Sequence, residues 1–60
     1  MTREQIKVGD VLCSVDENGC GYYRVLKVNR LTIDVQGENG NKMRSYPSMF
    51  DRKIDYPVNV

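Results

Sequence analysis

The chain has 60 residues, contains no histidine and carries a formal net charge of +1. A chain of this length is expected to form one domain over residues 1–60 with a thin core, because about 60% of the unfolded surface can be buried at this size. The near-neutral charge gives no general sign of a membrane or nucleic-acid partner. No apolar run exceeds three residues, so no transmembrane helix is expected.

The residue types needed for catalysis and metal binding are scarce. Serine and cysteine nucleophiles usually depend on a neighbouring general base, most often histidine, and this chain has none. A structural zinc site takes four ligands, mainly cysteine and histidine, whereas only Cys13 and Cys20 are available. We therefore expect no enzymatic activity, no cofactor, no bound metal and no small-molecule substrate.

The residues from Met1 to Gln5 are polar and of mixed charge, so no signal peptide is expected. This predicts a cytoplasmic protein whose cysteines stay as thiols. A disulfide between Cys13 and Cys20 is the less favoured alternative, because it requires a bend that brings the two backbones together.

The chain starts with a lead-in over residues 1–8, in which Ile6 and Val8 serve as apolar anchors. A turn at Gly9-Asp10 leads into a predicted strand over residues 11–15. Strand alternation places three of its apolar side chains on one face, namely Val11, Cys13 and Val15. Residues 16–21 are rich in Gly, Asn and acidic side chains, and they predict a loop.

A second strand is predicted over residues 22–28 and a third over residues 31–36, joined by the two-residue link Asn29-Arg30. In a hairpin of this kind four apolar side chains share one face, as the pairs Val28–Leu31 and Leu26–Ile33. Tyr23 and Val25 then fall on the opposite face, which indicates a bulge or a strong bend in the second strand.

The turn over residues 37–41 admits two registers. A two-residue turn would place Arg44 opposite Val35 and bury an unpaired charge, which is costly. A three-residue loop, Glu38-Asn39-Gly40 with Gly40 left-handed, pairs Val35 with Met43 instead. We favour the second register, in which Arg44 and Tyr46 point outward.

Residues 47–50 cannot continue a central strand because proline lacks the amide donor, so a short 3₁₀ turn is predicted there. Met49 or Phe50 would fill the end of the core. A closing strand is predicted over residues 53–58, with alternating apolar side chains at Ile54, Tyr56 and Val58. Five short strands in so short a chain must curl to bury one face, which predicts an all-β, partly open barrel.

This order of elements resembles an SH3-like barrel. The segment Tyr46-Pro47-Ser48-Met49-Phe50 is similar to the one at which SH3 domains enter their 3₁₀ turn. Gly9-Asp10-Val11, followed by Gly21 and Val25-Leu26-Lys27-Val28, resembles the KOW motif of SH3-like barrels in ribosomal and transcription-associated proteins. The size and the lack of a catalytic set also resemble small accessory proteins of phages and plasmids.

The resemblance implies a binding module, with two departures. The chain lacks the groove tryptophan and the Ala-Leu-Tyr-Asp-Tyr-like strand of SH3 domains that bind proline-rich peptides, so such a groove is not expected. Its first loop carries Asp16 and Glu17, where KOW-type RNA binders tend to carry basic residues.

Charge is distributed unevenly along the chain. Residues 24–53 contain seven basic and three acidic side chains, whereas residues 1–23 contain two basic and four acidic ones. Exposed tyrosine and arginine suit a protein interface or nucleic-acid stacking. We predict a binding surface made by Tyr22, Tyr23, Arg24, Arg30, Arg44 and Tyr46.

We expect only one residue of the Tyr22–Tyr23 pair to be exposed, because neighbouring strand residues alternate in direction. The partner expected for this surface is a protein rather than a nucleic acid, and no membrane is expected. Nucleic-acid binding through the basic middle of the chain is the alternative. A homo-oligomer formed through an exposed strand edge also stays open.

Overall fold

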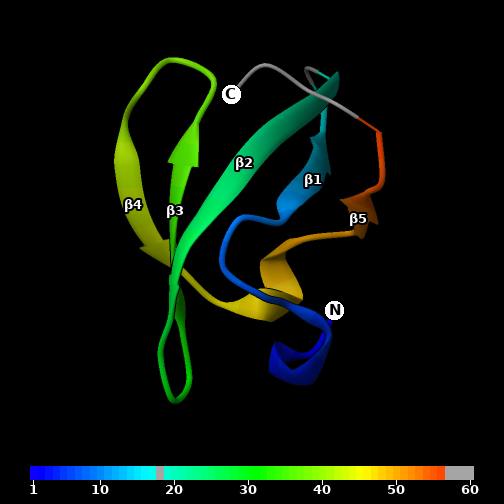
Figure 1. Ribbon diagram of the computed structural model, residues 1–60. Coiled ribbons are helices and arrows are strands. Elements are labelled where there is room, and N and C mark those ends of the chain that lie inside the picture. The colour runs from blue at the N-terminus through cyan, green and yellow to red at the C-terminus, as the bar shows by residue number, and fades with distance from the viewer. Residues whose placement is uncertain (18, 57–60) are drawn as a thin grey trace.

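The computed structural model describes residues 1–17 and 19–56, and these residues form one antiparallel β-sheet (Figure 1). The elements in chain order are the 3₁₀ turn η1 (Arg3–Gln5), β1 (Val11–Asp16), β2 (Gly19–Val28), β3 (Ile33–Gly37), β4 (Lys42–Ser45), the 3₁₀ turn η2 (Pro47–Met49) and β5 (Arg52–Ile54). The strand order is β4-β3-β2-β1-β5. The edge strands β4 and β5 do not pair within the described residues, so the sheet is not closed. The all-β prediction with five strands is confirmed.

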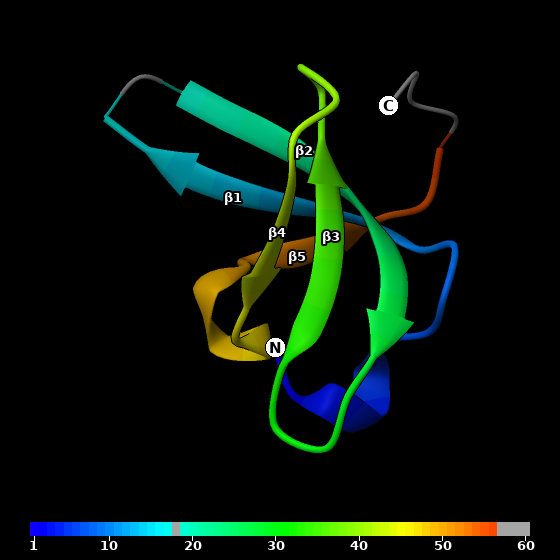
Figure 2. The same ribbon diagram turned by 90° about the vertical axis from the view of Figure 1, so that its left-hand side faces the viewer.

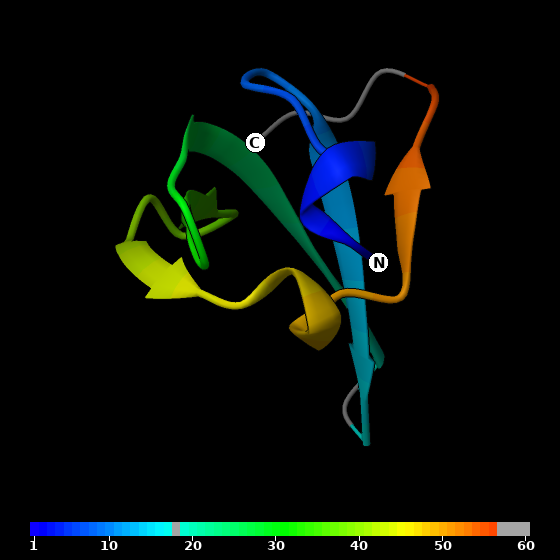
Figure 3. The ribbon, with the colours of Figure 1, turned by 90° about the horizontal axis from the view of Figure 1, so that it is seen from below.

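The sheet is strongly curled, which brings its two edges round the same concave face. Figure 2 shows the β1–β2 hairpin turned away from the β3–β4 hairpin, with β2 pairing with β1 at one end and with β3 at the other. Viewed from below, η2 crosses from β4 toward β5, and the N-terminal segment lies beside β1 (Figure 3). No helix among the described residues is long and apolar enough to cross a membrane.

The long strand β2 changes register at Leu26. Val25 lies opposite Val35, whereas Lys27 lies opposite Asp34, so one residue of β2 is left over. A bulge of this kind increases the local twist and bends the strand. The bulge predicted from the alternation of Tyr23 and Val25 against Leu26 and Val28 is confirmed.

The hairpin between β2 and β3 is wider than the sequence pattern predicts. Val28 pairs with Ile33, not with Leu31, and Leu26 lies in the bulge instead of pairing with Ile33. The backbone N–H of Asn29 donates to the carbonyl of Thr32 at 2.8 Å, and the Asn29 amide Nδ2 donates to Thr32 Oγ1 at 3.1 Å. These polar contacts stabilise the wider loop and leave Leu31 73% exposed.

The hairpin between β3 and β4 has the predicted register. Val35 pairs with Met43, and the backbone N–H of Gly37 donates to the carbonyl of Asn41 at 2.9 Å. Gly40 has a φ of +86°, the left-handed conformation that a three-residue loop requires. The register keeps Arg44 on the solvent side, as predicted, and leaves Met43 exposed at the edge.

The predicted loop over residues 16–21 is wrong. The β1–β2 ladder continues to the pair Asp16–Gly19, so strand pairing leaves only two residues between the strands. Gly19 has a φ of +116°, which lets the chain reverse this tightly. The amino-acid composition of residues 16–21 predicted a loop because composition does not include the energy of pairing between β1 and β2. That pairing extends the ladder up to the turn.

The expectation of two free thiols is also wrong, because Cys13 and Cys20 form a disulfide. The ladder pairs Cys13 with Tyr22 and Val15 with Cys20, so the two cysteines are diagonal neighbours on one face of the hairpin. Their Cα atoms are 6.2 Å apart, within the usual range for a disulfide. The extended hairpin therefore supplies the backbone approach that the sequence pattern did not predict.

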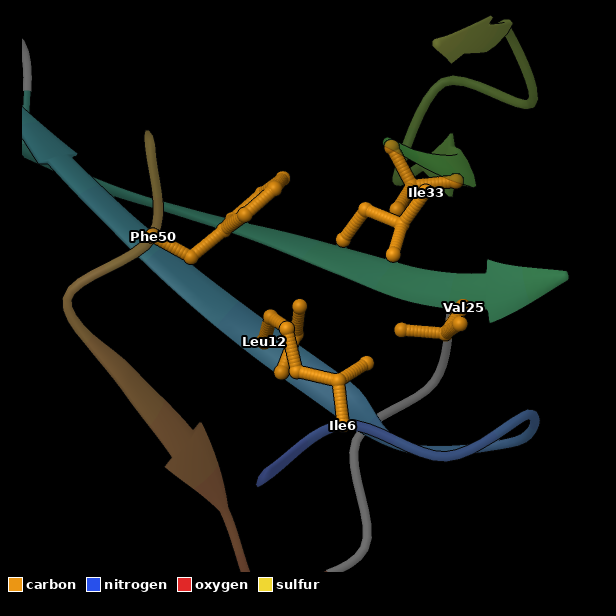
Figure 4. Close-up of a cluster of buried hydrophobic side chains, with 6 residues drawn as sticks. Ile6, Leu12, Val25, Ile33 and Phe50 are labelled. Carbon is orange, nitrogen blue, oxygen red and sulfur yellow. The ribbon is translucent and has the colours of Figure 1, made fainter. Parts of the chain in front are cut away.

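The main core lies on the concave face. It consists of Ile6, Leu12, Val25, Ile33, Val35 and Phe50 (Figure 4). The ring of Tyr23 packs edge-to-face on Phe50, with ring centroids 5.5 Å apart. Phe50 thus fills the end of the core after η2, as predicted, while Met49 is exposed.

A second, smaller cluster lies on the convex face and consists of Val11, Cys13 and Ile54 with Tyr22 packed against it. Besides Leu26 and Leu31, three more predicted core or anchor residues lie outside both clusters and are exposed, namely Val8, Val15 and Tyr56. The closing strand predicted over residues 53–58 is wrong in its bounds, because β5 spans Arg52–Ile54 and pairs only with Val11–Cys13 of β1. It therefore covers neither Val8 nor Val15, and Tyr56 lies beyond its end. The predicted contribution of Val58 lies outside the described residues.

The revised β2–β3 register predicts different costs for two neighbouring aliphatic residues. Replacing Ile33 by alanine should lower the free energy of unfolding by about 2–5 kcal/mol, because this side chain is fully buried. The same change at Leu31 should cost less than about 0.5 kcal/mol. Urea unfolding followed by circular dichroism measures both changes in the free energy of unfolding. A larger decrease for the Leu31 variant than for the Ile33 variant would support the two-residue hairpin instead.

The disulfide predicts the reactivity of the cysteines. In the denatured, unreduced protein neither Cys13 nor Cys20 should react with iodoacetamide, and both should react after a reductant is added. Mass spectrometry of the intact chain measures the number of modified thiols. Modification of both cysteines without reductant would show that the bond does not form in solution.

Candidate functional site

The convex face of β2, β3 and β4 gathers the basic side chains of the middle of the chain. Across these strands Arg24 lies opposite Gln36, which lies opposite Lys42. In the next row Lys27 lies opposite Asp34, which lies opposite Arg44. Cross-strand partners share one face of a sheet, so four cations lie on the same surface. This surface, made by Arg24, Lys27, Lys42 and Arg44, is called the basic face below.

One acidic side chain, Asp34, sits within the basic face and organises it. Arg44 Nε donates to Asp34 Oδ1 at 2.9 Å, and Asn29 Nδ2 donates to the same oxygen at 3.1 Å. The hydrogen bond from Arg44 lowers the pKa of Asp34 below its ordinary value of 3.8, and the amide of Asn29 and the charge of Lys27 act in the same direction. Asp34 therefore stays ionised and holds Arg44 in place.

Arg44 itself remains largely in solvent. Its side chain is 68% exposed although its Nε is bonded to Asp34, and the pairing raises the pKa of its guanidinium. Arg24 is half-buried, and its guanidinium donates to the carbonyl of Gly9 at 3.1 Å. The basic face thus has a fixed end at Arg24 and a more accessible end along β4.

An open hollow of about 350 Å³ lies at the accessible end and is lined by Leu26, Asp34, Lys42, Met43 and Arg44. Leu26 reaches it because the bulge turns this side chain to the convex face beside Lys27. Met43 belongs to the edge strand and is exposed. The lining therefore combines two apolar residues with two cations and the carboxylate of Asp34, which is paired with Arg44. This combination suits a ligand that carries both apolar and acidic groups.

The structure brings together only part of the predicted surface. Arg24 and Arg44 lie on the basic face. Tyr46 follows β4 directly and is 60% exposed. Arg30 lies apart, in the exposed loop between β2 and β3.

The two adjacent tyrosines lie on opposite faces, as alternation predicts, but both are half-buried and neither is fully exposed. Tyr23 points to the core, where a Cβ at Gly21 or Gly37 would lie 3.3 Å from its ring. These glycines therefore make room for the tyrosine. Tyr22 lies on the convex face, where a hydrogen bond with Tyr56 raises the pKa of its phenol.

Five residues of this site were not predicted from the sequence: Leu26, Lys27, Asp34, Lys42 and Met43. The two lysines were counted only as part of the basic segment, and Leu26 was assigned to an apolar face opposite Ile33. A usable signal existed in the predicted bulge, because a bulge sets two successive side chains against a single partner. The sequence did not specify which residue would occupy it.

A second hollow of about 220 Å³ is lined by Gly21, Tyr22, Tyr23, Gly37, Glu38 and Asn39. The backbone N–H of Tyr22 lies 3.5 Å from Glu38 Oε2 at this point, a long contact. Within residues 1–17 and 19–56 no group of three acidic, cysteine or histidine side chains is placed to hold a metal ion. Comparison with known proteins finds no matching family model, no matching curated protein and no matching solved structure.

The Arg44–Asp34 pair predicts a pH-dependent contribution to stability. A carboxyl whose pKa is lower in the folded state stabilises the fold above its ordinary pKa, and this stabilisation is lost as the pH falls through the folded value. Arg44→Gln should raise the pKa of Asp34 toward 3.8. The stability difference between this variant and the wild type should be present at neutral pH and vanish in acid.

Carboxyl titration by NMR measures this change, with urea unfolding at several pH values beside it. Lys42→Gln is the matched control, since Lys42 does not contribute to the shift of Asp34. An unchanged Asp34 titration in Arg44→Gln would contradict the pairing.

Proposed function

We propose that this protein is a non-catalytic binding module that docks an acidic surface of another protein on its basic face. The observation that carries the proposal is that Arg24, Lys27, Lys42 and Arg44 lie on one side of β2–β4. Lys42 and Arg44 also line a hollow together with Leu26 and Met43. Complementary charge steers such encounters, and an apolar centre supplies affinity. The absence of histidine from the whole chain supports a role without general acid–base chemistry.

We propose also that the fold is an SH3-like barrel. It is supported by the strand order β4-β3-β2-β1-β5 and by a 3₁₀ turn directly before the last strand. Such small barrels expose loops and strand faces on a fixed scaffold, which suits binding. The resemblance to KOW domains and to phage or plasmid accessory proteins belongs to the same proposal and rests on the sequence pattern alone.

Nucleic-acid binding is the second candidate, because four cations on one face also fit a phosphate backbone. Base recognition would use exposed aromatic rings beside the cations. Tyr23 points to the core and Tyr22 lies toward β1, which leaves Tyr46 as the predicted tyrosine next to β4. The basic face is therefore better matched to a protein surface with acidic and apolar groups.

Charge reversal on the basic face tests the proposal. The double variant Lys27→Glu/Lys42→Glu should reduce capture of the native partner by more than about tenfold, since it replaces attraction by repulsion. The control Lys7→Glu/Arg30→Glu changes the net charge by the same amount outside the basic face and should capture normally. Equal loss in both variants would remove the basic face as the binding site.

Titration with short DNA and RNA oligonucleotides separates the second candidate. Nucleic-acid affinity should fall steeply with added salt, with a slope that counts the neutralised phosphates. Fluorescence anisotropy measures this. Absence of binding at low salt would eliminate nucleic acid as the partner.

A cytoplasmic location, expected from the sequence, stays a prediction. The Cys13–Cys20 disulfide favours an oxidising environment, because reducing compartments keep most thiols free. The redox state of the two cysteines in protein recovered from its native host addresses this point.

A further inference from the structure

We propose that the open edge of β4 binds an extended acidic segment of a partner protein as an additional antiparallel or parallel strand. This inference rests on the proposed function and specifies the partner chemistry and the binding mode. Its basis is the coincidence, at Lys42 and Arg44, of unpaired backbone groups and positive side chains.

The backbone argument starts from the ladder between β3 and β4. The backbone N–H of Gly37 donates to Asn41 at 2.9 Å, so these two residues form a hydrogen-bonded pair. Such pairs alternate along an antiparallel ladder, and the pairs Val35–Met43 and Ile33–Ser45 are therefore hydrogen-bonded too. The amide and carbonyl groups of Lys42 and Arg44 consequently point away from β3.

Within the described part of the chain, β4 has no neighbour on that side. The outward-facing groups of Lys42 and Arg44 therefore present a template to which an extended peptide can add by backbone hydrogen bonds. Both side chains are exposed and project from one face of the sheet, while their backbone groups point outward in the plane of the sheet. A strand added at this edge would place every second side chain beside these two cations.

Charge complementarity decides the occupant. Opposite charges on neighbouring strands stabilise a sheet, whereas like charges destabilise it. A second copy of this chain would bring its own Lys42 and Arg44 to the shared face, so edge pairing between copies is disfavoured. A segment with glutamate or aspartate at alternate positions meets both cations instead, and its intervening apolar side chains lie on the other face of the sheet, beside Met43.

The other edge of the sheet does not offer the same combination. β5 has only three residues, against four in β4, and its Lys53 Nζ lies 3.3 Å from Asp10 Oδ2, much as Arg44 is paired with Asp34 on the β4 side. Asp51, which precedes β5, accepts a hydrogen bond from the backbone N–H of Val15 at 2.7 Å. β4 is the longer edge strand, and its two cations share a face with Arg24 and Lys27, so we assign the site to β4.

The test uses synthetic peptides of about eight residues with blocked ends, a length that forms one strand. The first alternates Glu and Val, the second alternates Lys and Val, and the third alternates Glu and Pro. The Glu–Pro peptide has the charge of the first but cannot pair as a strand. We expect the Glu–Val peptide to bind at least about tenfold more tightly than either control, as measured by NMR titration.

Amide hydrogen exchange in the wild-type protein reports the binding mode without any substitution. On addition of the Glu–Val peptide, the amides of Lys42 and Arg44 should become protected, while Met43 is already protected by its bond to β3. Protection elsewhere, or none at Lys42 and Arg44, would overturn strand addition. Dimerisation of the protein through the same amides in the absence of peptide, seen by light scattering, would also overturn it.

Two variants complete the test. Lys42→Pro removes an amide that faces outward and is not used by β3, so the fold should persist, as proline is tolerated at sheet edges. Lys42→Pro should lower the affinity for the Glu–Val peptide by at least about tenfold more than the control Lys42→Ala, which removes only the charge. Equal affinities of the two variants would overturn the inference.

The results separate this inference from the proposed function. Equal binding of the Glu–Val and Glu–Pro peptides, lost on charge reversal at Lys27 and Lys42, would keep the basic face as an acidic-surface site and eliminate strand addition. Binding of neither peptide would overturn strand addition, while capture of the native partner by the charge-reversal variants tests the proposed function independently.

Discussion

The architecture depends on one strand that pairs with two different partners. β2 lies opposite β1 along its first half and opposite β3 along its second half, with an overlap at Tyr23 and Arg24. A flat ten-residue strand could not bury side chains from both hairpins in a single core. The bulge at Leu26 bends β2, so Leu12 on β1 and Ile33 on β3 reach the same concave cluster. In a chain this short, that bend substitutes for a second layer of secondary structure.

The same bulge creates the surface on which the proposed function rests. It turns Leu26 out of the core and sets it beside Lys27, opposite Asp34. Asp34 in turn fixes Arg44 at the edge strand and accepts a hydrogen bond from Asn29 in the hairpin loop. The core and the basic face are thus two consequences of one local irregularity. A change that removed the bulge would alter both.

The two edges of the sheet differ for reasons of charge and length. β5 is short, and acidic residues on neighbouring segments pair with its lysine or with the adjacent backbone. β4 has a free edge along the described chain and two cations on one face. Lysine at an edge discourages pairing between copies of a protein. It does not discourage an acidic strand, and this asymmetry gives the edge its proposed specificity.

The alternation of apolar residues determined the strand count, and the missing amide of Pro47 determined the 3₁₀ turn before the last strand. The alternation also determined the β3–β4 register, because the alternative would have buried the charge of Arg44. Each of these features follows from the chemistry of residues that lie close together in the sequence. The full-length pairing of β1 with β2, the Cys13–Cys20 disulfide and the wide loop at Asn29 depend on the energy of long-range pairing. That energy does not appear in local composition.

The candidate surface was likewise predicted from the sequence only in part. The sequence by itself determined that the middle of the chain is basic and that Arg44 is exposed. Only the tertiary structure decided that Arg24, Lys27, Lys42 and Arg44 share one face, while Tyr23 turns to the core and Arg30 lies apart. The physical reason is the one-residue shift at Leu26. Strand alternation has a period of two, so a single extra residue reverses the face of every side chain beyond it.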